Sequence, residues 1–263
     1  MQTVTLGATR LEVTPIAYGT WQFGGDWGPV DERAAIAATG HARSLGINFF
    51  DTAQAYGFGR AERLLGAALA GELRSDRGKL VIATKGGLRM DGQQLVRDSS
   101  PAWLRKGVEA SLDALGIDYI DLYQVHWPDP GTPIPETAGA LADLVGEGLI
   151  RHVGVSNYST AQITEFATVL PVETVQPAYH LFRRDIESSL LPYARARDIG
   201  VLAYGPLAHG LLGGTIVGAR TPAHLDESAE AAELRLSQDD LAAIDRIMAA
   251  AVPVGGPSPE GMT

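Results

Sequence analysis

Two hydrophobic patterns alternate along most of this chain. Short apolar runs end in polar residues or glycine, and each is followed by a segment whose apolar residues recur every three to four positions. The first pattern predicts a strand and the second predicts a helix. Strands are predicted at 16–18, 47–51, 80–84, 120–125, 152–155, 174–177, 201–204 and 215–217. Helices are predicted near 32–45, 60–70, 101–115, 136–147, 160–169, 185–198 and 222–232.

This order of elements predicts an α/β fold. Strands that alternate with helices favour a parallel sheet, and eight such units predict a closed (β/α)8 TIM barrel. An open doubly wound sheet is the alternative, but no G-x-G-x-x-G follows the first strand. A β-hairpin is predicted at 3–14 before the barrel, and an extra helix is predicted at 237–250, opened by a capping signal at Ser237. We expect one domain over residues 1–263, with a frayed tail at 253–263.

The step between the seventh and eighth strands is unusually short. Only residues 205–214 separate Tyr204 from Thr215, and they show no helical pattern. A parallel crossover normally needs about a dozen residues or more. Either the helix between strands seven and eight is missing, or a stretch is omitted between Gly214 and Thr215. We favour omission, because every other step is complete.

Composition narrows the class of protein. The chain has 263 residues, of which 45% are hydrophobic and 20% charged, as in ordinary soluble globular proteins. A formal charge of −10 argues against a nucleic-acid backbone or an anionic membrane as partner. The absence of cysteine excludes disulfides and thiolate metal centres. The sequence shows neither a membrane span nor a signal peptide, so we expect a cytoplasmic protein that acts on a small molecule or on a partner that is not a polyanion.

Polar residues follow the predicted strands. In a TIM barrel, reactive groups gather at the C-terminal ends of the strands. Taken singly, a Lys–Asp pair, a tyrosine or a histidine at a strand end also fits a structural role. Several titratable groups on successive strand ends are costly unless paired, which indicates an active site. The residues at or just after the strand ends are Asp51, Tyr56, Lys85, His126, Ser156, Asn157, Gln176 and Tyr204.

Four of these residues suggest acid catalysis at a carbonyl group. A phenol, with a pKa near 10, is a poor proton donor at neutral pH. A Lys85 cation would favour the phenolate form of Tyr56, and Asp51 would keep that cation charged and in place. A neutral His126 could orient a carbonyl oxygen towards Tyr56. We find no nucleophile and no metal-ligand set in this pattern, so the missing reactant would be a hydride from a cofactor.

These segments resemble the aldo-keto reductases, which are NAD(P)H-dependent carbonyl reductases on a (β/α)8 barrel. The matching segments occur in the family's order and span residues 4 to about 248. They are Gly19-Thr20-Trp21, Phe50-Asp51-Thr52-Ala53 with Tyr56-Gly57, Thr84-Lys85, Val125-His126, Gly154-Val155-Ser156-Asn157, Gln176-Pro177-Ala178-Tyr179, Ala203-Tyr204-Gly205-Pro206-Leu207 and Ile216-Val217-Gly218-Ala219-Arg220.

The resemblance implies a role for each matching residue. Tyr56 would be the general acid/base, Lys85 and Asp51 would tune it, and His126 would position the carbonyl. Ser156, Asn157 and Gln176 would hold the nicotinamide carboxamide, Tyr204 would stack on its ring, and the pyrophosphate would lie close to Gly205, Leu207 and Gly210. Further contacts with the cofactor would come from Gly19, Thr20, Trp21, Asp51 and Pro206. The adenosine end would contact Gly218, Ala219, Arg220, His224, Glu227 and Ser228. Thr221-Pro222 predicts a helix N-terminus at that end, which suits a phosphate.

Cofactor preference and substrate are expected as follows. Ser228 stands where the family commonly has Asn, and His224 where it has Arg or Gln, so a 2′-phosphate would depend mainly on Arg220. We expect NADPH/NADP+ rather than NADH. The substrate pocket is expected to be lined by Trp21, Tyr56, His126 and Trp127, with Trp27 and Phe23 as further candidates at its mouth. Aromatic walls suit flat or bulky apolar carbonyl compounds.

Three functional hypotheses follow. The first is an NADPH-dependent reductase that converts an aldehyde or ketone to an alcohol, reversibly. The second is a cofactor-sensing regulatory subunit of the channel-associated type, which keeps the same four residues but turns over slowly. The third, an isomerase or aldolase with a Lys85 Schiff base, needs a neutral amine, whereas Asp51 would keep Lys85 charged.

Overall fold

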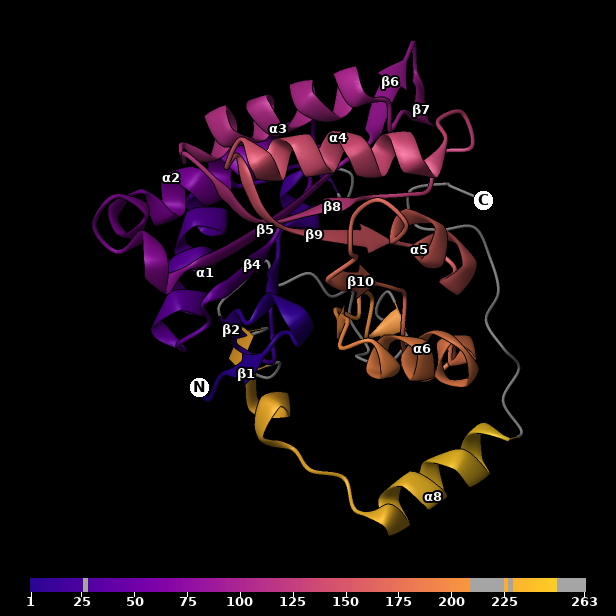
Figure 1. Ribbon diagram of the computed structural model, residues 1–263. Coiled ribbons are helices and arrows are strands. Elements are labelled where there is room, and N and C mark those ends of the chain that lie inside the picture. The colour runs from indigo at the N-terminus through magenta and orange to yellow at the C-terminus, as the bar shows by residue number, and fades with distance from the viewer. Residues whose placement is uncertain (26–27, 209–224, 227–228, 250–263) are drawn as a thin grey trace.

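A curled parallel sheet forms the centre of the molecule (Figure 1). The computed structural model describes residues 1–25, 28–208, 225–226 and 229–249. Its seven-stranded sheet has the order β11-β10-β9-β8-β5-β4-β3, and every neighbouring pair is parallel. The strands are β3 (Tyr18–Gly19), β4 (Phe49–Asp51), β5 (Val81–Gly86), β8 (Ile120–Val125), β9 (Ile150–Ser156), β10 (Thr174–Gln176) and β11 (Gly200–Val201).

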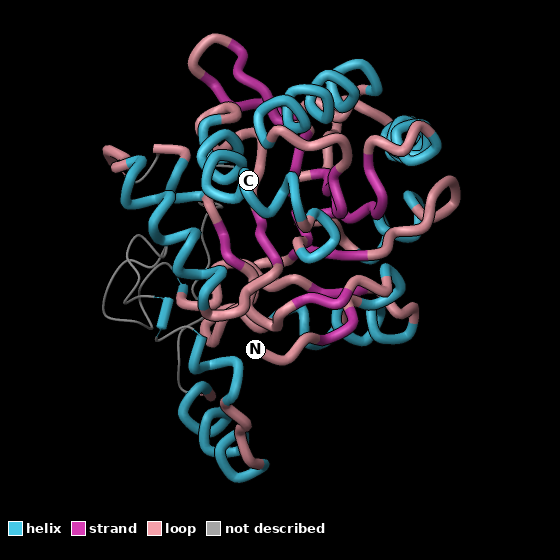
Figure 2. Tube along the Cα trace, turned by 90° about the vertical axis from the view of Figure 1, so that its left-hand side faces the viewer, coloured by secondary structure: helices cyan, strands magenta, loops and turns pink. Residues whose placement is uncertain are grey.

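Helices connect successive strands and surround the sheet, as Figure 2 shows from the side. They are α1 (Glu32–Ser44), α2 (Arg60–Ser75), α3 (Pro101–Leu115), α4 (Ile134–Gly146), α5 (Thr160–Phe166) and α6 (Leu190–Ala196). Side-chain caps explain several starts, because Asp31, Ser100 and Ser159 accept hydrogen bonds from backbone N–H groups in the first turn.

The strands are apolar because both faces of the sheet are covered. Every residue of β5 and β8 is buried, as expected for a parallel sheet with helices outside it. Ile82 packs outward in a cluster with α2, whereas Val81 and Ala83 pack inward with Leu122. This alternation places Lys85 on the inner face and Thr84 on the outer face.

Two antiparallel hairpins accompany the parallel sheet. The first joins β1 (Val4–Thr5) to β2 (Glu12–Val13), and its Leu6 and Val13 enter the inner core cluster. The second joins β6 (Leu88–Asp91) to β7 (Gln94–Arg97) directly after β5, and the hydrophobic pattern did not predict it. Asp91-Gly92 at its turn, where Gly92 has φ +59°, was the available signal.

The alternating strands and helices confirm the predicted α/β fold over the described residues. The predicted eighth strand at 215–217 and the Gly214–Thr215 junction lie outside them, as does the tail at 253–263. Closure of the barrel and the missing helix therefore stay predictions. No helix within residues 1–25, 28–208, 225–226 and 229–249 has the length and apolarity that a bilayer span requires.

Two predicted elements were wrong in extent. The helix predicted at 185–198 is a 3-10 helix, Asp185–Ser188, followed by α6. Pro192 explains the break, because its ring would clash with the carbonyl of Ser188 in a continuous helix. The seventh strand is only β11, and Tyr204 joins the sheet through an isolated bridge to Ala178. Of the helix predicted at 222–232, residues 225–226 and 229–230 are helical, and a 3-10 turn, Ala231–Glu233, follows them.

The last described helix is α8 (Gln238–Met248), which begins at the predicted cap residue. Ser237 and Asp240 form a capping box there. Figure 1 shows α8 away from the sheet, and none of its residues is buried. A hydrogen-bonded ion pair of 2.7 Å between Arg184 and Asp245 joins α8 to the segment before α6.

Candidate active site

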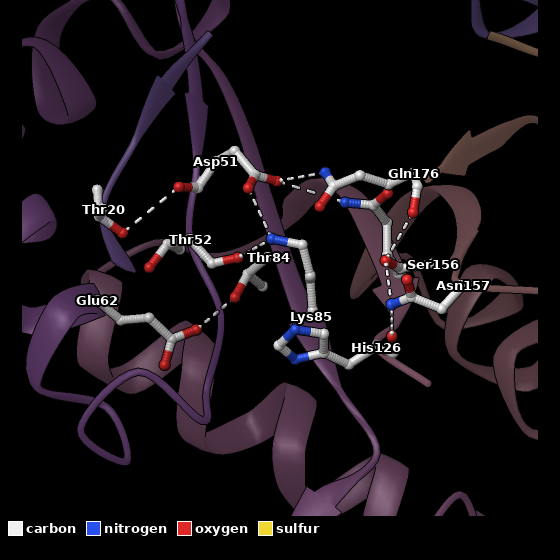
Figure 3. A network of polar contacts seen from close by, with 11 residues as sticks. Thr20, Asp51, Thr52, Glu62, Thr84, Lys85, His126, Ser156, Asn157 and Gln176 are labelled. Atoms are coloured by element: carbon white, nitrogen blue, oxygen red, sulfur yellow. Dashed lines mark hydrogen bonds and ion pairs between the residues drawn. The ribbon is translucent and has the colours of Figure 1, made fainter. Parts of the chain in front are cut away.

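The polar residues predicted at the strand ends converge at one edge of the sheet (Figure 3). Asp51 ends β4, Lys85 lies near the end of β5, and His126 follows β8. Ser156 ends β9 and Gln176 ends β10. They meet because parallel neighbouring strands place their carboxyl ends at the same edge.

A buried ion pair lies at the centre of this cluster. The Lys85 Nζ atom donates to Asp51 Oδ2 at 2.6 Å and to the carbonyl oxygen of Thr52 at 2.9 Å. The side chain of Lys85 is 1% exposed and that of Asp51 is 16% exposed. Desolvating an ammonium group is costly, so these acceptors are needed to keep the charged amine inside the sheet.

Two amide side chains hold the other oxygen of Asp51. Gln176 Nε2 donates to Oδ1 at 3.1 Å, and Gln124 Nε2 donates to the same atom at 3.4 Å. Asp51 is thereby fixed in orientation by groups from β5, β8 and β10. Gln124 was not predicted as a site residue, although it lies two positions before His126 and so points to the same face of its strand.

Tyr56 lies beside this pair, in the loop between β4 and α2. Its ring stacks against Trp21, with centroids 6.2 Å apart and planes at 28°. Lys85 Nζ is 5.3 Å from the centroid of the Tyr56 ring. The His126 ring meets Tyr56 edge-on, with centroids 5.8 Å apart. The four residues predicted to act in acid catalysis, Asp51, Tyr56, Lys85 and His126, are therefore close together in space.

The His126 imidazole is neutral at physiological pH. Its side chain is buried, and burial lowers its pKa well below the usual range, with the Lys85 cation lowering it further. Its backbone is fixed by His126 N–H donating to the Gly86 carbonyl at 2.9 Å. A neutral imidazole can hold a carbonyl oxygen without competing with Tyr56 as the acid.

A chain of hydrogen bonds links the predicted nicotinamide-binding residues. Ser156 Oγ donates to the Gln176 carbonyl at 2.8 Å, and Asn157 Nδ2 donates to Ser156 Oγ at 3.0 Å and to the His126 carbonyl at 3.1 Å. Tyr204 Oη donates to Asn157 Oδ1 at 2.9 Å. Asn157 has φ +62°, an unusual backbone for a residue other than glycine. These amide and hydroxyl groups suit a planar carboxamide beside the Lys85–Asp51 pair.

The remaining cofactor predictions divide into described and undescribed residues. Thr20 N–H donates to the Asp51 carbonyl at 3.0 Å, with Gly19 at the end of β3 beside it. Gly205, Pro206 and Leu207 follow Tyr204, and Gly205 has φ +64°. The residues that lie outside the described part of the chain are Gly210, Gly218, Ala219, Arg220, His224, Glu227 and Ser228.

The predicted substrate residues are brought together only in part. Trp21 and His126 flank Tyr56, and Trp127 directly follows His126 with its ring 5.3 Å from the Arg97 guanidinium carbon. Phe23 is wrong as a residue of the pocket mouth, because it is 2% exposed and packs against Tyr18 in the core. Trp27 lies outside the described residues.

A buried carboxyl group lies behind the site and was also missed. Glu62 of α2 is fully buried and accepts a hydrogen bond of 2.6 Å from Thr84 Oγ1 on β5. The available signal was a charged residue within the apolar stripe of the helix, between the buried Ala61 and Leu65.

Comparison with known proteins gives matches to one family. The sequence model of the Aldo/keto reductase family matches residues 15–215. An aldo-keto reductase of Bacillus subtilis is 44% identical over 215 residues, which cover 81% of this chain and 64% of that protein. The NADH-specific methylglyoxal reductase of Escherichia coli is 37% identical over 232 residues, covering 82% and 70%. The chain thus spans less than two thirds of the length of the first of these relatives.

Solved structures resemble the fold over nearly its whole length. The glycerol dehydrogenase of Gluconobacter oxydans has a TM-score of 0.86 and 32% identity, with 97% of each chain covered. An aldo/keto reductase of Klebsiella pneumoniae, solved with NADP and acetate, has a TM-score of 0.79 and 27% identity, covering 94% of this chain and 96% of that one.

Proposed function

The chain belongs to the aldo/keto reductase family, and from that premise we propose that it reduces an aldehyde or ketone to an alcohol with NADPH. The observation that carries the proposal is the grouping around Tyr56. Lys85 Nζ lies 5.3 Å from its ring centroid and is held by Asp51 at 2.6 Å, while the His126 ring lies 5.8 Å away.

Tyr56 is the proposed proton donor to the carbonyl oxygen. As that oxygen gains negative charge, the Tyr56 hydroxyl gives it a proton, and the phenolate that remains lies beside the Lys85 cation. The Lys85 ammonium stabilises this phenolate, and Asp51 holds the ammonium in place. In the oxidation direction the same phenolate accepts the proton of the alcohol.

His126 is the proposed orienting group. Because its pKa is lowered by burial and by Lys85, the imidazole is an uncharged hydrogen-bonding group at neutral pH. It directs the carbonyl oxygen towards the Tyr56 hydroxyl, while Trp21, stacked against the Tyr56 ring, restricts how the phenol can turn.

The hydrogen-bonded residues beside the Lys85–Asp51 pair form the proposed nicotinamide site. Ser156, Asn157 and Gln176 would hold the carboxamide, and Tyr204 would stack on the ring. When bound, the nicotinamide supplies the hydride that the carbonyl carbon receives. The hydrogen bond from Gln176 to Asp51 would link the position of the nicotinamide site to the Lys85–Asp51 ion pair.

NADPH rather than NADH is the proposed cofactor, and by the family resemblance Arg220 is the proposed ligand of its 2′-phosphate. One relative is named as NADH-specific, so the preference needs its own test. An Arg220→Ala variant should lose most of its preference for NADPH. Equal NADPH/NADH ratios of kcat/KM in the variant and the parent would contradict this role.

The proposed substrates are small carbonyl compounds. Trp21 stacks on Tyr56, and Trp127, which directly follows His126, is proposed as a second aromatic wall of the pocket. The names of similar proteins include a methylglyoxal reductase and a glycerol dehydrogenase. We therefore place methylglyoxal and glyceraldehyde beside aromatic aldehydes in the substrate panel.

The decisive experiment is NADPH oxidation, followed by its absorbance, with this panel. Tyr56→Phe should abolish turnover and leave NADPH binding intact. Tyr193→Phe is the matched control, because its hydroxyl bonds Thr164 on the outer helices at 2.8 Å. A Tyr56→Phe variant as active as Tyr193→Phe would refute the proposal, and tight NADPH binding without turnover would favour a cofactor-sensing subunit.

A further inference from the structure

A second polar pair lies on the outer face of β5, opposite to Lys85. Thr84 and Lys85 are neighbours in the strand, so their side chains point to opposite faces of the sheet. Thr84 Oγ1 donates to Glu62 Oε1 of α2 at 2.6 Å, and both side chains are fully buried. Figure 3 shows this bond together with the Lys85–Asp51 pair.

A carboxyl group in this place is unusual. Burial is the largest influence on Glu62 and raises its pKa, while the hydroxyls of Thr84 and Ser111 and the charges of Arg63 and Lys85 partly oppose that shift. The nearby cations Arg60 and Lys85 form their ion pairs with other carboxylates, Glu32 and Asp51. An apolar residue at this position would avoid the free-energy cost of burying a carboxyl group. The hydrogen bond between Glu62 and Thr84 therefore needs an explanation other than stability.

The backbone connects this pair to both reactive residues. Tyr56 is followed by Gly57, Phe58 and Gly59, which have φ values of +63°, +46° and +90°. This tight turn leads straight into α2, whose Ala61 N–H donates to the Tyr56 carbonyl at 3.2 Å. Glu62 therefore lies in the first turn of the helix that fixes Tyr56, and Thr84 lies next to Lys85.

We propose that Glu62 is a positioning residue that, through its hydrogen bond to Thr84, sets the separation between Tyr56 and Lys85. The inference rests on the proposed function of Tyr56 as the acid. Tyr56 and Lys85 come from different elements, and the Glu62–Thr84 bond ties those two elements together one residue away from Lys85. The proximity of Lys85 to the phenol depends on this tie, because Coulomb stabilisation falls with distance.

Thr84→Val is the most informative variant. Valine keeps the branched shape and burial of threonine but removes the hydroxyl. We expect kcat to fall on the order of 10- to 100-fold, as small misplacements of catalytic groups do, with NADPH binding unchanged. The alkaline limb of the kcat–pH profile should move to higher pH, because a more distant Lys85 stabilises the phenolate less.

Other charged and titratable groups face Tyr56 and Glu62. Lys85 and His126 face Tyr56, and Asp51 acts on it through Lys85. Around Glu62 they are Arg63, Lys85 and Tyr123. None of these is altered in Thr84→Val, so a shift in the profile reports the lost bond.

Three further variants separate positioning from packing. Thr39→Val removes another fully buried hydroxyl, bonded to the Ala35 carbonyl at 2.9 Å in α1, and should leave kcat and the pH profile unchanged. Glu62→Gln keeps an oxygen acceptor for Thr84 and should remain close to the parent in kcat. Glu62→Leu should behave like Thr84→Val, and combining those two changes should cost no more than either alone.

The outcomes distinguish this proposal from the function it rests on. If the parent is an active reductase and Tyr56→Phe is inactive, but Thr84→Val matches Thr39→Val in kcat and pH profile, the positioning role is overturned. A lower melting temperature alone would likewise mean that the bond only stabilises the fold. If Tyr56→Phe retains full activity, the acid assignment fails first.

Discussion

Gly86 lies where a strand and a buried tyrosine are in contact, so alanine at this position should destabilise the protein. A Cβ atom there would lie 1.8 Å from Tyr123 Oη and 2.9 Å from Tyr123 Cζ. Tyr123 is 0% exposed and packs in the largest core cluster, so its ring has little room to move away. Inserting a methyl group into such a packed site costs about 1–3 kcal/mol.

Removing the hydroxyl of Tyr123 should relieve most of that cost. In the double variant Gly86→Ala with Tyr123→Phe, the closest atom is the ring carbon at 2.9 Å, which a shift of a few tenths of an ångström accommodates. The Tyr123 hydroxyl makes no hydrogen bond within the described residues, so Tyr123→Phe alone should gain about 1 kcal/mol by ending the burial of an unsatisfied polar group. The coupling energy between the two sites should be about 1–3 kcal/mol.

Urea unfolding at pH 7, followed by tryptophan fluorescence, measures all four proteins of this cycle. Each kcal/mol should also move the melting temperature by about 2–4 °C in a chain of this size. Gly139→Ala in α4 is the control, because a Cβ there meets nothing within 4 Å and alanine favours a helix by about 0.5–1 kcal/mol. If Gly86→Ala costs as much in the Tyr123→Phe background as in the parent, the steric explanation is incorrect.

Three further predictions concern buried titratable or charged groups. The pKa of Glu62 is raised in the folded state, so the folded protein favours the neutral carboxyl group. The resulting contribution to stability is fully present below the unfolded-state pKa of about 4.3 and is lost as pH rises through the folded-state pKa. Glu62→Gln should remove this part of the pH dependence of the unfolding free energy, measured with urea between pH 4 and 8, and an unchanged pH dependence would contradict the prediction. Arg77 forms an ion pair of 2.6 Å with Asp121, which is 4% exposed, so Arg77→Ala should lower the unfolding free energy by about 3–5 kcal/mol. The activity of the folded fraction should stay intact, because this pair lies at the N-terminal ends of the strands and the candidate site lies at their C-terminal ends. Nitrogen NMR of labelled imidazoles should find His126 neutral from pH 8 down to pH 6, since burial and Lys85 lower its pKa; protonation of His126 near pH 6.5 would oppose this assignment.

The chain order alone determined which residues gather at the site. Asp51, Lys85, His126 and Gln176 each follow an apolar run in a strand–helix alternation, and parallel strands bring such ends to one edge of a sheet whatever their separation in sequence. Local patterns also determined the caps at Ser100, Ser159 and Ser237, because a side-chain cap depends only on the residues of its own first turn.

Only the tertiary structure decided which partners these groups have. Gln176 and Gln124 meet the same oxygen of Asp51, and Glu62 meets Thr84, through contacts between residues from different strands or between a strand and a helix. Such pairings depend on the register of the strands, the curl of the sheet and the way α2 packs on it, none of which the apolar period specifies. The pattern places a residue on a face; the packing of the elements sets which atoms come within hydrogen-bonding distance, because that distance tolerates an error of only a few tenths of an ångström.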